Sequence, residues 1–122
     1  MSNEINLNAT LEYEDSEGTA LSLQIVNLLA SVASKKPIAF KQNIGITEEA
    51  IGLGETTAPG WAMFINRDET NFVNLKVATG GAIFAKLKPG EFAFLRLGSG
   101  AQAPFAIADT AACQLEVLIC NT

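Results

Sequence analysis

Apolar and polar residues alternate along most of this chain. Over residues 5–14, Ile, Leu, Ala, Leu and Tyr take the odd positions, and Asn, Thr and Glu take the even ones. This period of two is typical of a half-buried strand. The alternation returns over residues 20–25, after the turn residues at 16–18, so we expect the two strands to form a hairpin. Residues 26–34 fit a helical face as well as a strand, and we interpret them as a continued strand followed by a loop.

The rest of the chain repeats this pattern in shorter segments that are separated by turn residues. The clearest turn is residues 88–91, because Pro89 presets φ at the second position and Gly90 tolerates a positive φ at the third. About eight to nine short strands at this spacing predict an all-β fold, a single β-sandwich that is jelly-roll-like and spans residues 1–122. After the first hairpin, strand character is found in residues 38–44, the short segment 48–53, 61–66, 71–77, 82–87, 92–97, the short edge-like segment 104–108, and 114–119.

Composition excludes several classes of function. The chain has 122 residues, 48% of them hydrophobic and 17% charged, which suits one domain with its own core. Its 8 Lys and Arg against 13 Asp and Glu argue against a dedicated nucleic-acid binder, because such proteins present a basic face. The sequence has no histidine, which excludes His-ligated zinc and catalysis by an imidazole. We therefore expect no enzyme activity, no catalytic residue, no cofactor and no metal site.

The surplus of negative charge lies at the start of the chain. Residues 18–122 carry as many positive as negative charges, so the net charge of -5 arises in residues 1–17. We expect residues 1–17 to form an acidic strand or hairpin arm that contacts a basic partner surface. A solvated hairpin tip is the alternative, and calcium would need about six to eight converging oxygen ligands, for which the spacing is wrong. The expected contact residues are Glu12, Glu14, Asp15 and Glu17.

Three further groups have both a functional and a structural interpretation. The polar stretch Asn66–Asn71 could bind a ligand, but Asp, Asn and Thr also cap tight turns, and we favour a structured turn. The adjacent Glu48 and Glu49 would point to opposite faces of a strand and could not act as a glycosidase pair. Trp61 heads the most apolar segment, so we expect it in the core rather than as an exposed stacking platform. We expect most of the seven phenylalanines in the core as well.

The cysteines and the start of the chain indicate where the protein is made. Cys113 and Cys120 are seven residues apart in one predicted strand, which puts them on opposite faces and about 23 Å apart, too far for a disulfide. We expect two reduced thiols that pack as small apolar residues. The acidic start lacks the features of a signal peptide, and no apolar run approaches the ~20 residues of a membrane span. We therefore expect synthesis in the cytoplasm and no contact with a membrane.

Several segments of the second half resemble a known kind of protein. Residues 59–73 contain GW, NRD and TNFV, residues 86–93 contain KLKPGE, and the chain continues with ADTA at 108–111 and LEVLI at 115–119. In this order the segments are similar to small structural proteins of the virions of tailed bacteriophages. The resemblance covers residues 43–120.

The resemblance implies a virion structural protein. Within that class we favour a capsid decoration (cement) protein that binds and stabilises the lattice of the major capsid protein. The resemblance also implies a homo-oligomer, either a trimer or a dimer, whose partner is the major capsid protein or another virion protein. Two alternatives stay open: a tail, baseplate or fibre component, and a small β-sandwich module that binds a carbohydrate or a receptor.

Overall fold

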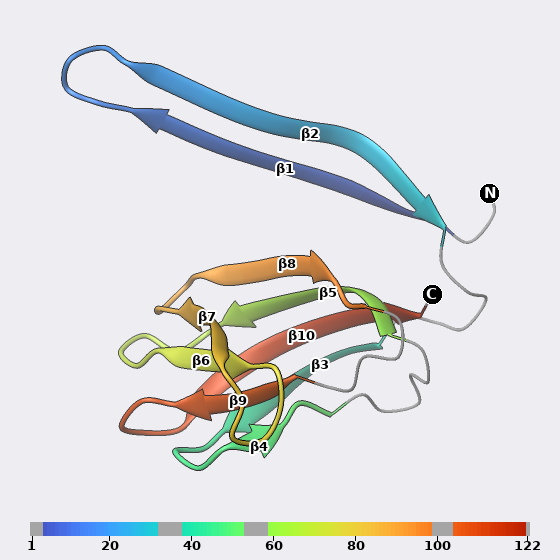
Figure 1. The fold of residues 1–122 in the computed structure, drawn as a ribbon, viewed down its shortest axis with the longest axis vertical. Helices are drawn as coiled ribbons and strands as arrows, with labels where there is room; N and C mark the ends of the chain where they lie inside the picture. Colours follow the sequence, from blue (N-terminus) through green and yellow to red (C-terminus); the bar gives the residue numbers. More distant parts are fainter. Residues whose placement is uncertain (1–3, 32–37, 53–58, 99–103, 122) are drawn as a thin grey trace. The chain divides into compact units, whose positions relative to one another are not determined.

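The computed structural model describes residues 4–31, 38–52, 59–98 and 104–121. All regular structure within these ranges is β-strand, in ten strands joined by turns and loops. The chain divides into two compact units, Met1–Ser34 and Lys35–Thr122. The first holds a two-stranded hairpin and the second holds eight strands in two sheets (Figure 1). The prediction of an all-β sandwich is therefore confirmed.

Most strands lie within about two residues of the predicted segments: the strand predicted over 71–77 is shorter, Val73–Lys76, and the strand predicted over 114–119 is longer, Cys113–Asn121. Residue 53, the end of the segment predicted over 48–53, lies outside the described residues. The strand predicted over 48–53 pairs only at Glu49–Ala50, and the strand predicted to start at Trp61 already begins at Pro59. A proline is tolerated as the first residue of a strand because its missing N–H is not needed there. In chain order the strands are β1 (Glu4–Glu14), β2 (Ala20–Ser31), β3 (Ile38–Ile44), β4 (Glu49–Ala50), β5 (Pro59–Asn66), β6 (Val73–Lys76), β7 (Ile83–Leu87), β8 (Phe92–Arg96), β9 (Phe105–Ala108) and β10 (Cys113–Asn121).

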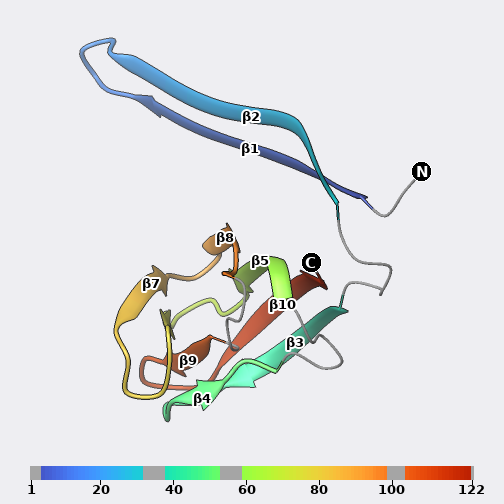
Figure 2. The same cartoon turned by 45° about the vertical axis from the view of Figure 1, so that its right-hand side comes forward.

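The eight strands of the second unit form a jelly roll. One sheet has the order β3-β10-β5-β8 and the other the order β4-β9-β6-β7, and all neighbouring strands are antiparallel. The first strand pairs with the last, the second with the seventh, the third with the sixth, and the fourth with the fifth. This nesting is the pairing of an eight-stranded jelly roll, built from two Greek keys. Figure 2 shows β3 and β10 side by side in one sheet.

The hydrophobic core lies between these two sheets. In β5 the burial alternates, so that Ala62, Phe64 and Asn66 are buried while the residues between them are only half-buried. Burying one Val, Leu, Ile or Phe side chain stabilises a fold by about 1.5–3 kcal/mol, and this unit buries many of them. The core cluster consists of Ile44, Ile51, Ala62, Phe64, Val73, Leu75, Leu87, Leu97, Ala106, Ala108, Cys113, Leu115, Val117 and Ile119.

The aromatic residues lie elsewhere than predicted. Trp61 is not in the core cluster, because the strand alternation that turns Phe64 inward places Trp61 on the outer face of its sheet. It is half-buried there and tilted against Phe94, with 5.4 Å between the ring centroids. All seven phenylalanines lie in the described ranges, yet only Phe64 is fully buried, and Phe84, Phe92 and Phe94 are exposed. The prediction that Trp61 and most phenylalanines pack in the core is wrong.

The first unit is the hairpin of β1 and β2. The two strands run side by side from the pair Glu4–Ser31 at the open end to the pair Glu14–Ala20 at the turn (Figure 1). At about 3.4 Å per residue the 11 residues of β1 span about 35 Å. The predicted continuation of the second strand beyond residue 25 is confirmed as far as Ser31, and the loop predicted after it lies outside the described residues. A single domain over 1–122 with residues 1–17 as an arm stays a prediction.

Candidate functional site: the two faces of the hairpin

Residues opposite each other in the hairpin share a face, and the register puts apolar residues opposite apolar ones. Tyr13 lies opposite Leu21, and Leu11 opposite Leu23. Leu7 is buried, whereas the large side chains from Leu11 to Leu28 on this side are 45–74% exposed, and no member is charged. We name this side the apolar face, and its members are Ile5, Leu7, Ala9, Leu11, Tyr13, Leu21, Leu23, Ile25, Leu28 and Ala30.

A β-bulge keeps the apolar face continuous. Between the pairs Leu7–Leu28 and Ala9–Ile25, β2 contains one residue more than β1. Side chains alternate with a period of two, so without this extra residue Leu28 and Ala30 would turn to the opposite side of the hairpin. The bulge therefore extends the apolar face over almost the whole length of the strands.

Three asparagine side chains hold this bulge. Asn27 adopts a positive φ of 55°, a left-handed conformation in which Asn is enriched among the non-glycine residues. Its backbone N donates a hydrogen bond to Asn8 Oδ1 at 2.9 Å, and Asn8 Nδ2 donates to Asn6 Oδ1 at 3.2 Å. Asn6 Nδ2 completes the ring by donating to Asn27 Oδ1 at 3.4 Å. The polar residues at these positions thus fix the backbone geometry that aligns the apolar face.

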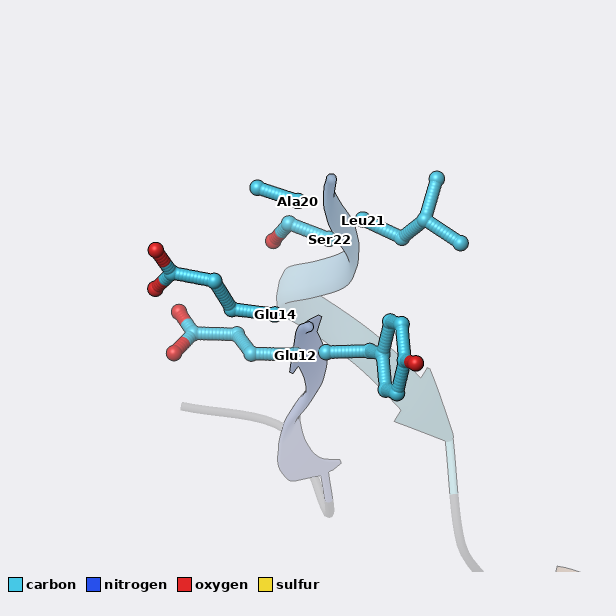
Figure 3. A pocket seen from close by; sticks show the side chains of 6 residues that line it. Glu12, Glu14, Ala20, Leu21 and Ser22 are labelled. Atoms are coloured by element: carbon cyan, nitrogen blue, oxygen red, sulfur yellow. The ribbon is translucent and has the colours of Figure 1, made fainter. Parts of the chain in front are cut away.

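The opposite side of the hairpin is negatively charged. Figure 3 shows Glu12 and Glu14 directed to one side of the hairpin and Leu21 to the other. The hollow at the hairpin tip is not an enclosed ligand cavity, because its lining side chains diverge to both sides. The described residues 4–31 contain five carboxylates and no Lys or Arg. We name this side the acidic face, and its members are Glu4, Asn6, Asn8, Thr10, Glu12, Glu14, Ala20, Ser22, Gln24, Leu29 and Ser31.

Asp15 shapes the turn of the hairpin. Its Oδ1 accepts hydrogen bonds from the backbone N of Glu17 at 3.0 Å and of Thr19 at 2.8 Å. Gly18 follows with a φ of 86°, which a residue with a side chain rarely adopts. The Asp15 carboxylate is therefore engaged inside the turn, whereas the other three predicted contact residues are exposed. The structure thus gives one of the four predicted contact residues a structural role of its own.

The polar stretch Asn66–Asn71 is a hydrogen-bonded turn. Asn66 Nδ2 donates to the backbone oxygens of Asn71 at 2.9 Å and Leu87 at 3.0 Å, and its Oδ1 accepts from the backbone N of Asp68 at 2.9 Å. Asp68 Oδ2 accepts from the backbone N of Asn71 at 2.6 Å and of Thr70 at 3.0 Å. These two bonds lower the pKa of Asp68. The bonds agree with the interpretation of this stretch as a structured turn.

The two adjacent glutamates serve different loops. Glu48 Oε2 accepts a hydrogen bond from Lys76 Nζ in an ion pair, and its Oε1 accepts from the backbone N of Gly80 at 2.7 Å. These bonds, the one from Lys76 first, lower the pKa of Glu48. Glu49 Oε1 instead accepts from the backbone N of Gly45 at 3.1 Å. The two carboxylates have separate structural partners and do not converge on a common site.

Both cysteines carry free thiols in buried positions. Cys113 belongs to the core cluster, while Cys120 is buried outside that cluster, which agrees with the prediction that they face opposite ways. Burial raises the pKa of both thiols. A protonated, enclosed thiol is a poor nucleophile, so these positions are packing positions.

An apolar hollow of about 270 Å³ lies in the jelly-roll unit. It is slightly smaller than the range of about 300–1,000 Å³ that is common for small-molecule sites, and Arg96 is the only charged residue among the described residues that line it. This hollow is therefore a weaker candidate for a functional site than the two faces of the hairpin. The lining residues are Val77, Phe84, Leu95, Arg96, Leu97, Gly98 and Pro104.

Compared with known proteins, the chain matches no family model, no curated protein and no solved structure. Within the described ranges, no group of three or more Cys, Asp or Glu residues could hold a metal ion. That part of the chain also contains no helix long and apolar enough to cross a membrane. The fold and the site together define a class, an eight-stranded jelly roll that carries a two-faced β-hairpin.

Proposed function

We propose that this protein is a structural component of a tailed-bacteriophage virion, and that within the virion it is a decoration protein bound to the major capsid protein lattice. The observation that carries the proposal is the hairpin, which exposes one acidic face and one apolar face over two long strands. A protein that acts by attachment needs such surfaces and needs no reaction centre. The resemblance of residues 43–120 to virion proteins of tailed bacteriophages supports the proposal that the particle is such a virion.

The distribution of charge supports a capsid contact through the acidic face. Residues 1–17 carry the net charge of -5, while residues 18–122 sum to zero. A basic surface on the capsid would therefore attract the hairpin and leave the jelly roll unaffected at long range. Glu12 and Glu14 on the acidic face and Glu17 in the adjoining turn are exposed, and they are the groups that would meet that surface. Attachment of this kind weakens as the salt concentration rises.

Attachment to particles that lack the protein tests the proposal. We expect the triple variant Glu12→Gln, Glu14→Gln, Glu17→Gln to bind about tenfold more weakly at low salt, since exposed ion pairs contribute about 0.2–1 kcal/mol each. Glu69→Gln is the matched control, because Glu69 is an exposed carboxylate on the jelly-roll unit. Equal binding of the triple variant and the control would contradict the role of the acidic face. Binding of the unaltered protein to tails alone would place it in the tail, baseplate or fibre.

A second candidate function is binding of a carbohydrate or receptor. It is favoured by the ring pair of Trp61 and Phe94 on the outer face of a sheet, since sugar-binding surfaces present aromatic rings. Trp61 Nε1 is buried and has no hydrogen-bond partner among the described residues, so this edge of the ring is closed to a ligand. Acrylamide quenching of Trp61 fluorescence distinguishes the candidates: strong quenching that an added oligosaccharide reduces would favour the binding module over a decoration protein.

A further inference from the structure

We infer that the apolar face of the hairpin packs against the apolar face of the hairpin of a second copy of this chain. The inference goes beyond the capsid contact proposed above, which uses the acidic face. It also does not require the virion role, because the purified protein is sufficient to test it.

The apolar face needs a cover. A hairpin of two strands is at best marginally stable in water, and further packing is needed to hold it. Its six large exposed side chains leave about 600 Å² of apolar surface in water, the upper end of the range for the largest patch on a monomer. A patch of that size marks an interaction surface. The six side chains are Leu11, Tyr13, Leu21, Leu23, Ile25 and Leu28.

The area fits a second copy of the same face. Two such faces packed together would bury about 1,200 Å² in total, which is the lower limit for a specific and stable interface. The two surfaces have the same length, the same register and no charged member, so they are complementary to themselves, as a two-fold contact requires. The product is a two-layered sandwich of four strands, with its sheets about 10 Å apart.

The charges of the hairpin agree with this arrangement. Glu12 and Glu14 lie on the acidic face, so they point away from the contact in both copies. Two sheet layers then separate the carboxylates of one copy from those of the other by more than the screening length of about 8–10 Å. Packing through the acidic faces would instead bring like charges together. The charge pattern therefore favours the apolar face as the side that two copies share.

One surface of the jelly-roll unit also exposes large apolar side chains, and it fits the hairpin less well. This surface is the outer face of the sheet β3-β10-β5-β8, where Phe92 is 60% exposed and Leu118 is 44% exposed. Charged side chains interrupt it, namely Lys41 on β3, Glu116 on β10 and Arg96 on β8. Covering this surface with an uncharged face would strip water from Lys41 and Arg96 without supplying partners, and would also remove water from the exposed ion pair of Glu116 with Arg67. The hairpin of the second copy is the better match.

The test is the mass of the full-length protein in solution, measured by light scattering behind a sizing column. We expect the unaltered protein to have at least twice the mass of one chain, and Leu23→Asp to weaken association about 100-fold, because the contact would bury an unpaired carboxylate. Leu23 is 74% exposed in the single chain and lies outside the jelly-roll unit, so the change leaves the fold of that unit intact, which urea unfolding followed by Trp61 fluorescence checks. Gln24→Asp is the matched control, since it adds the same charge to the neighbouring residue on the acidic face. It should leave the mass unchanged.

Each contrary outcome is distinct. A monomeric unaltered protein, or an oligomer that persists in Leu23→Asp, overturns the inference. Equal dissociation of Leu23→Asp and Gln24→Asp overturns it as well, because charge alone would then be responsible. Phe92→Asp on the outer sheet face should leave the mass unchanged. Loss of the oligomer in this variant would overturn the inference, because the outer sheet face, rather than a second hairpin, would then pack against the apolar face. None of these results depends on attachment to a capsid.

Discussion

Removing the side chain of Asn66 is expected to destabilise the jelly roll more than any loss of a surface contact. Asn66 is fully buried, and it bonds the backbone of the turn that follows β5 and of the last residue of β7. In Asn66→Ala the carbonyl oxygens of Asn71 and Leu87 and the backbone N of Asp68 lose their side-chain partner. An unpaired buried group costs about 1–3 kcal/mol, and part of this turn can be reached by water, so we expect a loss of about 3–4 kcal/mol.

Urea unfolding followed by Trp61 fluorescence measures this loss, because Trp61 lies in the jelly-roll unit. With a slope of about 1–3 kcal/mol per molar urea, the midpoint should fall by about 2 M while the slope stays the same. Asn43→Ala is the control, since Asn43 is exposed on β3 and should change the free energy of unfolding by no more than about 0.5 kcal/mol. A loss below about 1 kcal/mol in Asn66→Ala, or a loss equal to that of the control, would refute the reasoning.

Three other predictions concern the same unit. Hydrogen bonds lower the pKa of Asp68, so its contribution to stability is present above the ordinary pKa of an aspartate and is lost as the pH falls through the lowered native pKa. Asp68→Asn should therefore flatten the acid side of a plot of unfolding free energy against pH. An unchanged slope would contradict this. Cys113 and Cys120 are each 1% exposed and have raised pKa values, so neither should react with a thiol reagent at pH 8 until urea unfolds the protein. Rapid labelling of the native protein would show that one of them is accessible. In Gly81→Ala the new Cβ would meet a side-chain carbon at 2.9 Å and a backbone oxygen at 3.0 Å, so urea unfolding should show that the free energy of unfolding falls by about 1–2 kcal/mol. In the control Gly98→Ala the new Cβ has no atom within 4 Å, so the free energy of unfolding should hardly change.

Local patterns in the sequence predict the strands well but not their partners. The alternation of β1 and of the start of β2 indicates the hairpin, and the spacing of turns indicates a sandwich. The pairing of β3 with β10 joins residues about 75 positions apart, and the sequence of neither strand indicates which strand is its partner. Sequence order of short strands is compatible with many sheets, so the jelly-roll topology needs the long-range contacts that only the structure provides.

Two particular residues show why a local pattern misleads. Trp61 is large and apolar, which suggests a core position. Side chains alternate between the two faces of a strand, however, and because Phe64 of β5 points into the core, Trp61, three residues earlier, points outward. Asn27 explains the ambiguous segment after residue 25, because a bulge there shifts the period of two and makes the apolar positions imitate a helix. The acidic residues were visible in the sequence, yet the role of Asp15 inside the turn depends on the backbone geometry of that turn.

The two units of this chain gain their stability in different ways. The jelly roll encloses its own core, whereas in the hairpin only Leu7 is buried. If a second copy covers the apolar face, then association stabilises the ordered hairpin by mass action, and its stability depends on protein concentration while that of the jelly roll does not. Amide hydrogen exchange in β1 and β2 should therefore slow as the concentration is raised, with exchange in β10 unchanged. Exchange that is independent of concentration in both units would mean that the hairpin is held by contacts within one chain.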